Sequence, residues 1–296
     1  VMAIIFKYSD DKKLPLVDLQ DLKALMQFMG DEGKEEVTKL YGNISPATIS
    51  TILRKIIELE QQHADVFFGE PSFDPHDLLR TDLNGKGYIS ILRLTDIQDR
   101  PKLFSTFMLS LLAEVYGSFP EVGDPDKPKL VLFIDEAHLI FEEATKELLD
   151  QIETTMKLIR SKGVGVFYCT QKPQDVPSSV LSQLGLKVQH ALRAFTSADR
   201  KTIERAAENF PESSYYKVDD VLTQMGIGEA LVTALNEKGI PTMLVHTMMC
   251  PPSSRMDVLQ DAEINELVSA SQLVRVYRET LDRQSAFELL QERMHP

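Results

Sequence analysis

The sequence predicts an α/β fold: a mainly parallel sheet with helices on both faces, plus a helical insertion near the start of the chain. Strand-like and helix-like segments alternate between residues 86 and 210, which implies parallel strands joined by right-handed crossovers. The apolar run 130–134 (LVLFI) is typical of a strand that is buried on both faces. With 296 residues, 43% of them apolar, the chain is long enough to bury a sizeable core.

The segment before residue 81 is expected to be mainly helical after one initial strand. Residues 2–8 (MAIIFKY) predict a strand, and 18–29 predict a short amphipathic helix. Ser45-Pro46 offers an N-cap followed by a proline in the first helical position. A longer helix is expected from there to residue 62, because isoleucine and leucine recur at helical spacing.

From residue 81 onward, strands and helices are predicted to alternate. The expected strands are 88–94, 130–134, 164–170, 186–194, 228–235 and 242–249, of which the last two form a hairpin around 236–239. The expected helices are 101–119, 142–163, 178–185 and 197–210. Ligands bind at the carboxyl ends of the strands in such sheets, which places Asp135, Glu136 and Gln171 on one rim.

These elements divide the chain into four parts. Residues 1–8 are interpreted as an early core strand and 9–80 as a mainly helical insertion subdomain. Residues 81–250 contain the α/β core, and 251–296 form a polar, helical tail after two prolines. Basic residues in the insertion are accompanied by many acids, which favours a solvated or subunit-contacting surface over a DNA platform.

Composition excludes several classes of protein. No apolar run approaches the roughly 18 residues that span a membrane, and the first residues lack a secretory-signal pattern. We therefore expect a cytoplasmic protein without a membrane-spanning segment. Cys169 and Cys250 have neither metal nor disulfide spacing and are predicted to be buried thiols. The net charge of −13 disfavours a broad nucleic-acid-binding surface, although a narrow basic channel is compatible with it.

Two adjacent acids, Asp135 and Glu136, end the strand 130–134. An apolar strand followed by Asp-Glu fits the Walker B element of P-loop NTPases, in which the Asp holds Mg²⁺ and the Glu orients or deprotonates the attacking water. The alternative is a strand that ends in a solvated acidic turn. The next residues complete a DEAH sequence, which recurs in helicases, whereas His138 alone is more typical of a capping or packing residue.

Gln171 lies one strand further along the chain, just beyond 164–170. A neutral amide there can hydrogen-bond the γ-phosphate or its water without competing for the metal. Taken alone, Gln171 would be an ordinary polar loop residue. Its position one strand away from Asp135 and Glu136 favours the functional interpretation.

Four segments, in order along the chain, resemble the HerA–FtsK group of RecA-like motor ATPases, and more narrowly the bacterial HerA-like helicase family: VLFIDEAHLIF, LIRSKGVGVFYCTQKPQDVP, LSQLGLKVQHALRAF and GIGEALV. The resemblance runs collinearly over about residues 1–255. It implies a RecA-like P-loop NTPase core in a homo-hexameric ring that binds ATP and Mg²⁺ at subunit interfaces and acts on DNA. A nuclease is a further candidate partner.

Carried over by position, the family pattern makes Asp135 the metal-binding acid, Glu136 the catalytic glutamate and Gln171 the sensor glutamine. By the same resemblance, Asp135, Glu136 and Gln171 would also contact the bound ATP. These roles are what the resemblance implies.

Two arginines are candidates for contact with the γ-phosphate. Arg160 resembles the arginine of a turn that would reach into a neighbouring subunit, and pairing with the acids Glu143 and Glu147 is the alternative. Arg193, at the end of the strand 186–194, is the second candidate, and pairing with a nearby acid is its alternative.

A P-loop NTPase also needs the phosphate-binding sequence G-x-x-x-x-G-K-[ST]. The printed sequence does not contain it; residues 85–87 (GKG) lack the preceding glycine and the hydroxyl residue, and fit a hairpin-type turn. The chain starts at Val1, and the family's loop lies upstream of the resembling part. We therefore expect residues upstream, and expect this polypeptide alone to hydrolyse ATP poorly or not at all.

Two functions remain compatible with the sequence. The favoured one is an ATP-hydrolysing DNA motor or helicase-like subunit. The alternative is a non-catalytic RecA-like module for assembly or partner binding. A metal-dependent hydrolase using Asp135 and Glu136 is disfavoured, because no His or Asp cluster has ligand spacing.

Overall fold

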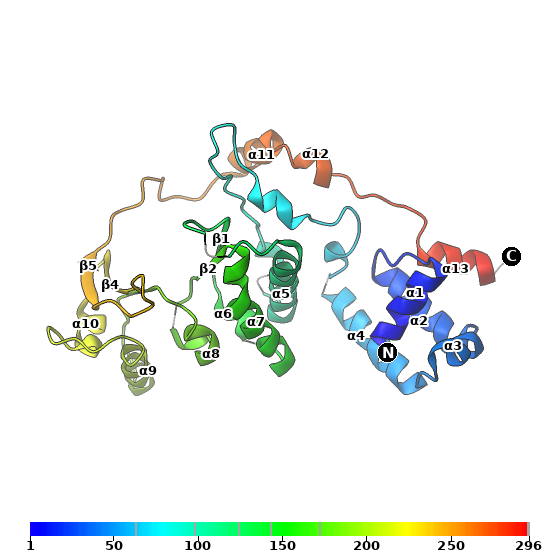
Figure 1. Ribbon diagram of the computed structural model, residues 1–296, viewed down its shortest axis with the longest axis horizontal. Coiled ribbons are helices and arrows are strands. Elements are labelled where there is room, and N and C mark those ends of the chain that lie inside the picture. The colour runs from blue at the N-terminus through cyan, green and yellow to red at the C-terminus, as the bar shows by residue number, and fades with distance from the viewer. Residues whose placement is uncertain (63, 98, 124, 143, 172, 295–296) are drawn as a thin grey trace. The chain divides into compact units, whose positions relative to one another are not determined.

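The computed structural model describes residues 1–296 with the exception of 63, 98, 124, 143, 172, 295 and 296. The chain forms two units, which we call the first unit (1–74 with 259–296) and the second unit (75–258). Figure 1 labels the helices and strands of both.

The first unit is built from helices. Its N-terminal part contains α1 (Met2–Lys12), α2 (Leu19–Gly30), α3 (Lys34–Tyr41), α4 (Pro46–Gln61) and a 3₁₀ turn, Ala64–Phe67. Its C-terminal part contains α11 (Asp261–Ala270), α12 (Val274–Tyr277) and α13 (Ala286–Met294). Apolar faces of α1, α2, α3, α4 and α13 meet in one core, which includes Ile5, Leu25, Met26 and, from α13, Leu290.

Residues 2–8 belong to helix α1, so the predicted early strand is wrong. A short apolar run suits either a strand or a buried helix, and the run alone does not decide between them. Ile5 and Tyr8, three residues apart, lie on one helical face and are 1% and 0% exposed. Lys13 then ends the helix in the left-handed conformation, with φ 53°.

The second unit contains the strands and the remaining helices. In its first half are 3₁₀ turns at Pro75–Leu79 and Thr95–Ile97, then α5 (Pro101–Ser118), β1 (Leu130–Ile134), α6 (His138–Phe141), α7 (Lys146–Leu158), a 3₁₀ turn at Ile159–Lys162 and β2 (Val164–Tyr168). In its second half are a 3₁₀ turn at Pro173–Asp175, α8 (Ser178–Leu181), β3 (Lys187–His190), α9 (Ser197–Ala207), α10 (Val218–Gln224), β4 (Glu229–Thr233) and β5 (Val245–Met248).

Strands β1 and β2 are parallel, with Leu130 opposite Val164 and Ile134 opposite Tyr168. The connection between them runs through α6 and α7, as the alternating pattern predicted. Helices α5, α6 and α7 lie beside this strand pair in Figure 1. Their buried residues include Leu112, Ile140 and Ile152, each 0% exposed.

The other face of the β1–β2 pair is not covered within the described part of the chain. Phe133 is 69% exposed and Phe167 39% exposed, and their rings stack with centroids 4.6 Å apart. The prediction that this strand is buried on both faces is therefore wrong for the described residues. An apolar run shows that both faces suit burial, but the covering layer must come from elsewhere in the chain or from a partner.

Strands β3, β4 and β5 form an antiparallel sheet in that order, whereas a mainly parallel sheet was predicted. The alternation of strands and helices does not fix strand direction, and the connection through α9 and α10 returns β4 antiparallel to β3. The predicted hairpin between β4 and β5 is confirmed. Its turn is held by Asn236, whose side-chain oxygen accepts the N–H groups of Lys238 and Ile240 at 2.9 and 3.0 Å.

Residues 88–94 form no strand, contrary to prediction. Ile89 and Ile91 are 91% and 79% exposed, and the nearest ladder contact is an isolated bridge between Thr81 and Gly87. A strand requires a hydrogen-bonded neighbour along its length, and among the backbone hydrogen bonds of the described residues this segment has one to a neighbouring segment, from the Tyr88 N–H to the Arg80 carbonyl at 3.1 Å. The strand propensity of residues 88–94 does not show whether a neighbouring strand is available to pair with them.

Candidate functional site

The carboxyl ends of β1 and β2 form the candidate site. Beyond Ile134 and Tyr168 the ladder continues, because the Cys169 N–H donates to the Ile134 carbonyl and the Ala137 N–H donates to the Cys169 carbonyl, both at 2.9 Å. Asp135 and Glu136 leave β1 at this edge, and Gln171 follows β2 at the same edge. Parallel pairing therefore brings the three predicted residues to one rim, as expected.

Asp135 is exposed at the tip of β1. Its Oδ1 accepts the N–H of Glu136 at 3.0 Å, which fixes the carboxylate against the turn. Mg²⁺ usually takes one or two carboxylates and completes its octahedron with water and phosphate oxygens, so a single exposed aspartate suits this metal beside a nucleotide. Among the described residues, no group of three or more His, Cys, Asp or Glu could hold a metal by itself.

Cys169 also lies at this rim, and the prediction that the two cysteines are buried is wrong. Both Cys169 and Cys250 are exposed rather than buried. Partial burial and the negative charge of Asp135 raise the pKa of the Cys169 thiol. The thiol is therefore close enough to Asp135 to sense its charge, and it can report on that carboxylate.

Glu136 has a left-handed backbone, with φ 48°. In the described chain the other non-glycine residue with positive φ is Lys13, which ends a helix. For an L-residue with a Cβ this conformation costs about 1–2 kcal/mol, and such strain is concentrated at functional sites. The turn that carries Glu136 is thus unusual in the way that catalytic turns are.

Buried polar atoms without hydrogen bonds gather at the same place. In the described part of the chain these side-chain atoms are Glu136 Oε2, His138 Nδ1 and the Tyr168 hydroxyl. All three residues belong to the ends of β1 and β2 or to the start of α6. Unsatisfied buried polar atoms are rare and often mark a catalytic group or a missing ligand.

Two of these atoms face each other. Glu136 Oε2 and His138 Nδ1 are 3.2 Å apart, within ion-pair distance although not aligned as a hydrogen bond. Tyr168 lies on the neighbouring strand with its ring 5.8 Å from that of Phe141 in α6, and burial raises the pKa of its hydroxyl. The DEAH sequence pointed to His138, but the sequence held no signal for Tyr168.

Gln171 lies in the exposed bend that follows β2. Thr170, its neighbour, donates its hydroxyl to Asp175 Oδ2 at 3.2 Å, which ties the bend to the following 3₁₀ turn. The bend that carries the Gln171 amide is therefore anchored by this hydrogen bond.

Arg160 lies at the opposite end of β2. It belongs to the 3₁₀ turn Ile159–Lys162, which precedes the strand, whereas Gln171 follows it. Five strand residues span roughly 16 Å, so Arg160 cannot join Asp135 within one chain. Of the two acids considered as its alternative partners, Glu143 lies outside the described residues.

Arg193 is bound to backbone carbonyls. Its Nη1 donates to the Thr223 carbonyl at 2.6 Å and its Nη2 to the Met225 carbonyl at 3.0 Å. These carbonyls lie at the C-terminal end of α10, where cations are favourable. The expected alternative, pairing with an acid, is thus replaced by pairing with a helix end.

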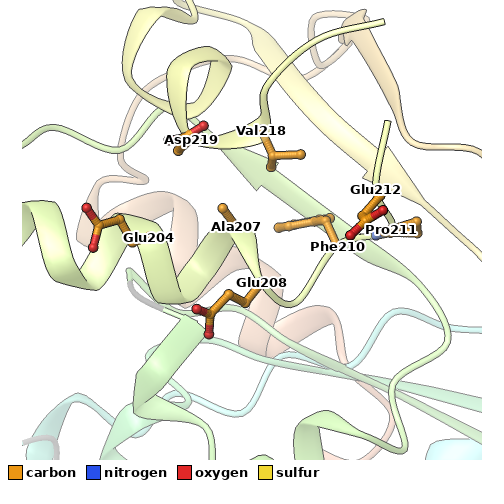
Figure 2. Close-up of a pocket in the computed structure, with 8 residues that line it drawn as sticks. All are labelled: Glu204, Ala207, Glu208, Phe210, Pro211, Glu212, Val218 and Asp219. Atoms are coloured by element: carbon orange, nitrogen blue, oxygen red, sulfur yellow. The ribbon is translucent and has the colours of Figure 1, made fainter. Parts of the chain in front are cut away.

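A hollow of about 420 Å³ lies elsewhere in the second unit, between α9 and the start of α10. Figure 2 shows Ala207, Phe210 and Val218 in its middle, with acidic side chains around them. Its lining residues are Glu204, Ala207, Glu208, Phe210, Pro211, Glu212, Val218 and Asp219, so it contains no predicted site residue. The acidic walls would repel a polyphosphate, and we do not assign the nucleotide to this hollow.

None of the described helices has both the length and the apolar character that crossing a membrane requires.

The family described as Helicase HerA-like C-terminal matches residues 1–296. A probable helicase of Methanocaldococcus jannaschii, MJECL08, is 32% identical over 154 residues, which cover 49% of this chain and 28% of that protein. The matched part is therefore less than a third of that helicase.

Two solved structures are similar at low identity. VirB4 of Thermoanaerobacter pseudethanolicus is 16% identical with a TM-score of 0.47, over 77% of this chain and 54% of that one. B204, the DNA-packaging ATPase from Sulfolobus Turreted Icosahedral Virus, is 16% identical with a TM-score of 0.36, over 58% of this chain and 78% of that one. The family match covers the whole chain, and the protein belongs to the Helicase HerA-like C-terminal family.

Proposed function

We propose that this chain is the Walker B and sensor part of an ATP-hydrolysing DNA motor with a RecA-like core. The observation that carries the proposal is the rim itself. A strained acidic residue, Glu136, faces His138 at the carboxyl end of β1, and Tyr168, with a buried unpaired hydroxyl, ends the parallel strand β2 in a HerA-like chain.

In the proposed mechanism each rim residue has a distinct task. Mg²⁺, when bound, would neutralise charge on the phosphates. Asp135 offers the exposed carboxylate that would hold the metal, and Glu136 would take the proton of the attacking water. Gln171 would donate its amide to the γ-phosphate or orient the water. General-base assistance of this kind contributes roughly 10²–10⁴-fold to a rate.

The proposal extends to the assembly. Arg160 would act on the ATP of a neighbouring subunit, which suits a homo-hexameric ring, and Arg193 is the second candidate for this role. The phosphate loop would come from a preceding part of the protein, so the printed chain alone should hydrolyse ATP poorly. DNA as substrate, a cytoplasmic location, a nuclease partner and membership of the bacterial branch are further parts of the proposal, which rest on family resemblance.

The test is ATP hydrolysis by the full-length protein that contains this chain. Glu136→Gln should lower kcat by about 100-fold or more, because the amide cannot accept the proton of the water. Glu147→Gln removes the same charge from an exposed position in α7 and should leave kcat unchanged. Equal kcat for the two variants, or wild-type protein without Mg²⁺-dependent hydrolysis, would refute the motor.

Binding of ATPγS with Mg²⁺ gives a second measurement. The full-length protein should bind the nucleotide much more tightly than the 296-residue chain, because the phosphate loop supplies backbone amides and a lysine. Equal affinity would show that the phosphate site has been misplaced.

The second candidate, a non-catalytic assembly module, is favoured by the exposed stacked pair Phe133 and Phe167. Such apolar surface is typical of a contact with another polypeptide. Hydrolysis that depends on Glu136 would exclude this alternative.

A further inference from the structure

We propose that His138 is a positioning residue that anchors one oxygen of the Glu136 carboxylate and leaves the other oxygen for the attacking water. This inference rests on the proposed function, because Glu136 is taken as the proton acceptor. It assigns to His138 a task that is separate from metal or nucleotide binding.

The contact between the two side chains carries the inference. Glu136 Oε2 and His138 Nδ1 are both buried, lie 3.2 Å apart, and have no hydrogen-bond partner elsewhere in the described residues. Each atom therefore depends on the other. Leaving a buried acceptor unsatisfied costs about 1–3 kcal/mol, so a small rotation that aligns an Nδ1–H with Oε2 is favoured.

The two oxygens of Glu136 are not equivalent. Oε2 is buried against the histidine, whereas the side chain as a whole keeps 33% of its surface exposed. Oε2 is the oxygen of this carboxylate that is buried without a hydrogen bond, and the exposed third of the side chain leaves room for a water to reach the carboxylate. A carboxylate held by one oxygen presents the other in a defined direction, and restricting a catalytic group in this way speeds a reaction.

His138 is well placed to be the fixed partner. It is the first residue of α6, whose remaining residues, 139–141, are all buried. The preceding Ala137 is 0% exposed and donates its N–H to the carbonyl of Cys169, the residue after β2. The backbone of His138 is therefore held by buried neighbours. Glu136 lies in a strained turn, and a strained conformation persists only where surrounding contacts hold it in place.

The choice of nitrogen makes the proposal specific. The anchoring atom is Nδ1, which is bonded to Cγ of the ring. The side-chain amide of asparagine places an N–H donor at the corresponding position, whereas the amide of glutamine lies one bond further out, where Nε2 of histidine is. His138→Asn should therefore preserve the anchor, and His138→Gln and His138→Ala should lose it.

Steady-state ATP hydrolysis by the full-length protein tests whether asparagine, but neither glutamine nor alanine, can replace His138. We expect His138→Ala and His138→Gln to lower kcat about 10–100-fold through loss of orientation, with KM for ATP changed by less than about twofold. His138→Asn should recover most of kcat. Thermal unfolding of each variant confirms that the proteins compared are folded. Equal loss in all three variants, or a change confined to KM, would overturn the positioning role.

Nuclear magnetic resonance of the 296-residue chain tests the contact without ATP. Glu136→Gln should shift the ring ¹⁵N signal of His138 Nδ1, and Glu147→Gln should leave it unchanged. No shift with Glu136→Gln would overturn the anchor. If the shift is present but the full-length protein does not hydrolyse ATP, the proposed function fails and the positioning role fails with it, while the contact itself stands.

Discussion

Glu136 is a glutamate, a residue type that often serves as a general base, and it has a backbone conformation that is unfavourable for any residue with a Cβ. Its φ of 48° suits glycine, which has no Cβ to clash, and its buried Oε2 depends on His138. The adjacent acids could be recognised from the sequence, because an apolar strand followed by Asp-Glu is a recurring pattern. The left-handed turn and the histidine contact could not, since they arise from how β1 meets α6.

The strain at Glu136 can be measured. Glu136→Gly should be more stable than Glu136→Ala by about 1 kcal/mol, because alanine keeps the Cβ in a left-handed conformation. At an ordinary helical position the order is reversed, since glycine there is the less stable residue. Urea unfolding of the two variants measures the difference. Alanine equal to or better than glycine would mean that φ at this position is not positive in solution.

The second prediction at this scale uses Cys169 as a reporter of Asp135. The raised pKa of the thiol, caused by partial burial and then by Asp135, leaves less reactive thiolate at pH 8. Asp135→Asn removes the negative charge, lowers that pKa and should speed alkylation several-fold in a Cys250→Ser background.

Glu147→Gln is the matched control for this measurement and should leave the alkylation rate unchanged. Slower alkylation in the Asp135→Asn variant would contradict the prediction, and would mean that the Asp135 carboxylate does not raise the pKa of the Cys169 thiol.

At the scale of elements, Arg193 has two possible roles: contact with the γ-phosphate, as the sequence predicted, or capping of a helix. In this structure its guanidinium caps the C-terminal end of α10 through the carbonyls of Thr223 and Met225. The sequence predicted an arginine at the end of a strand and could not show which group it binds. Helix α10, which supplies the partners, was not among the predicted helices.

Arg193→Ala should therefore destabilise the 296-residue chain by about 1 kcal/mol, through loss of hydrogen bonds from a charged group. Arg193→Lys should recover little, because one ammonium cannot reproduce the two-pronged contact. Chemical denaturation measures both. Unchanged stability together with loss of ATP hydrolysis in the full-length protein would instead assign Arg193 to the nucleotide.

On the scale of the whole molecule, the two ends of the chain build the first unit together. Asp21 in α2 is 1% exposed and accepts the Ser285 hydroxyl at 2.5 Å and the Phe287 N–H at 2.8 Å. Its second oxygen accepts the N–H groups of Val17 and Asp18 at 2.8 and 3.1 Å. The polar C-terminal tail is thus joined to the N-terminal helices through Ser285 and α13.

Asp21→Ala should lower the opening free energy of the first unit by about 3 kcal/mol, because several buried donors lose their acceptor. Hydrogen exchange of the amides in α2 and α13 measures the change. Asp10→Ala, which removes an exposed acid from α1, should leave the exchange rates near those of the wild type. Loss of protection confined to α2 would contradict the connection to α13.

The sequence by itself determined which segments form most of the helices and strands, the closure of the β4–β5 hairpin, and the position of Asp135, Glu136 and Gln171 at the ends of two neighbouring strands. These features depend on local patterns, which residues carry in their order along the chain. Tertiary structure alone decided that 2–8 is helical, that β3, β4 and β5 run antiparallel, and that His138 faces Glu136. Those outcomes depend on which surfaces pack against each other. Burial and strand pairing between residues that are distant in the sequence outweigh the local conformational preference of each segment.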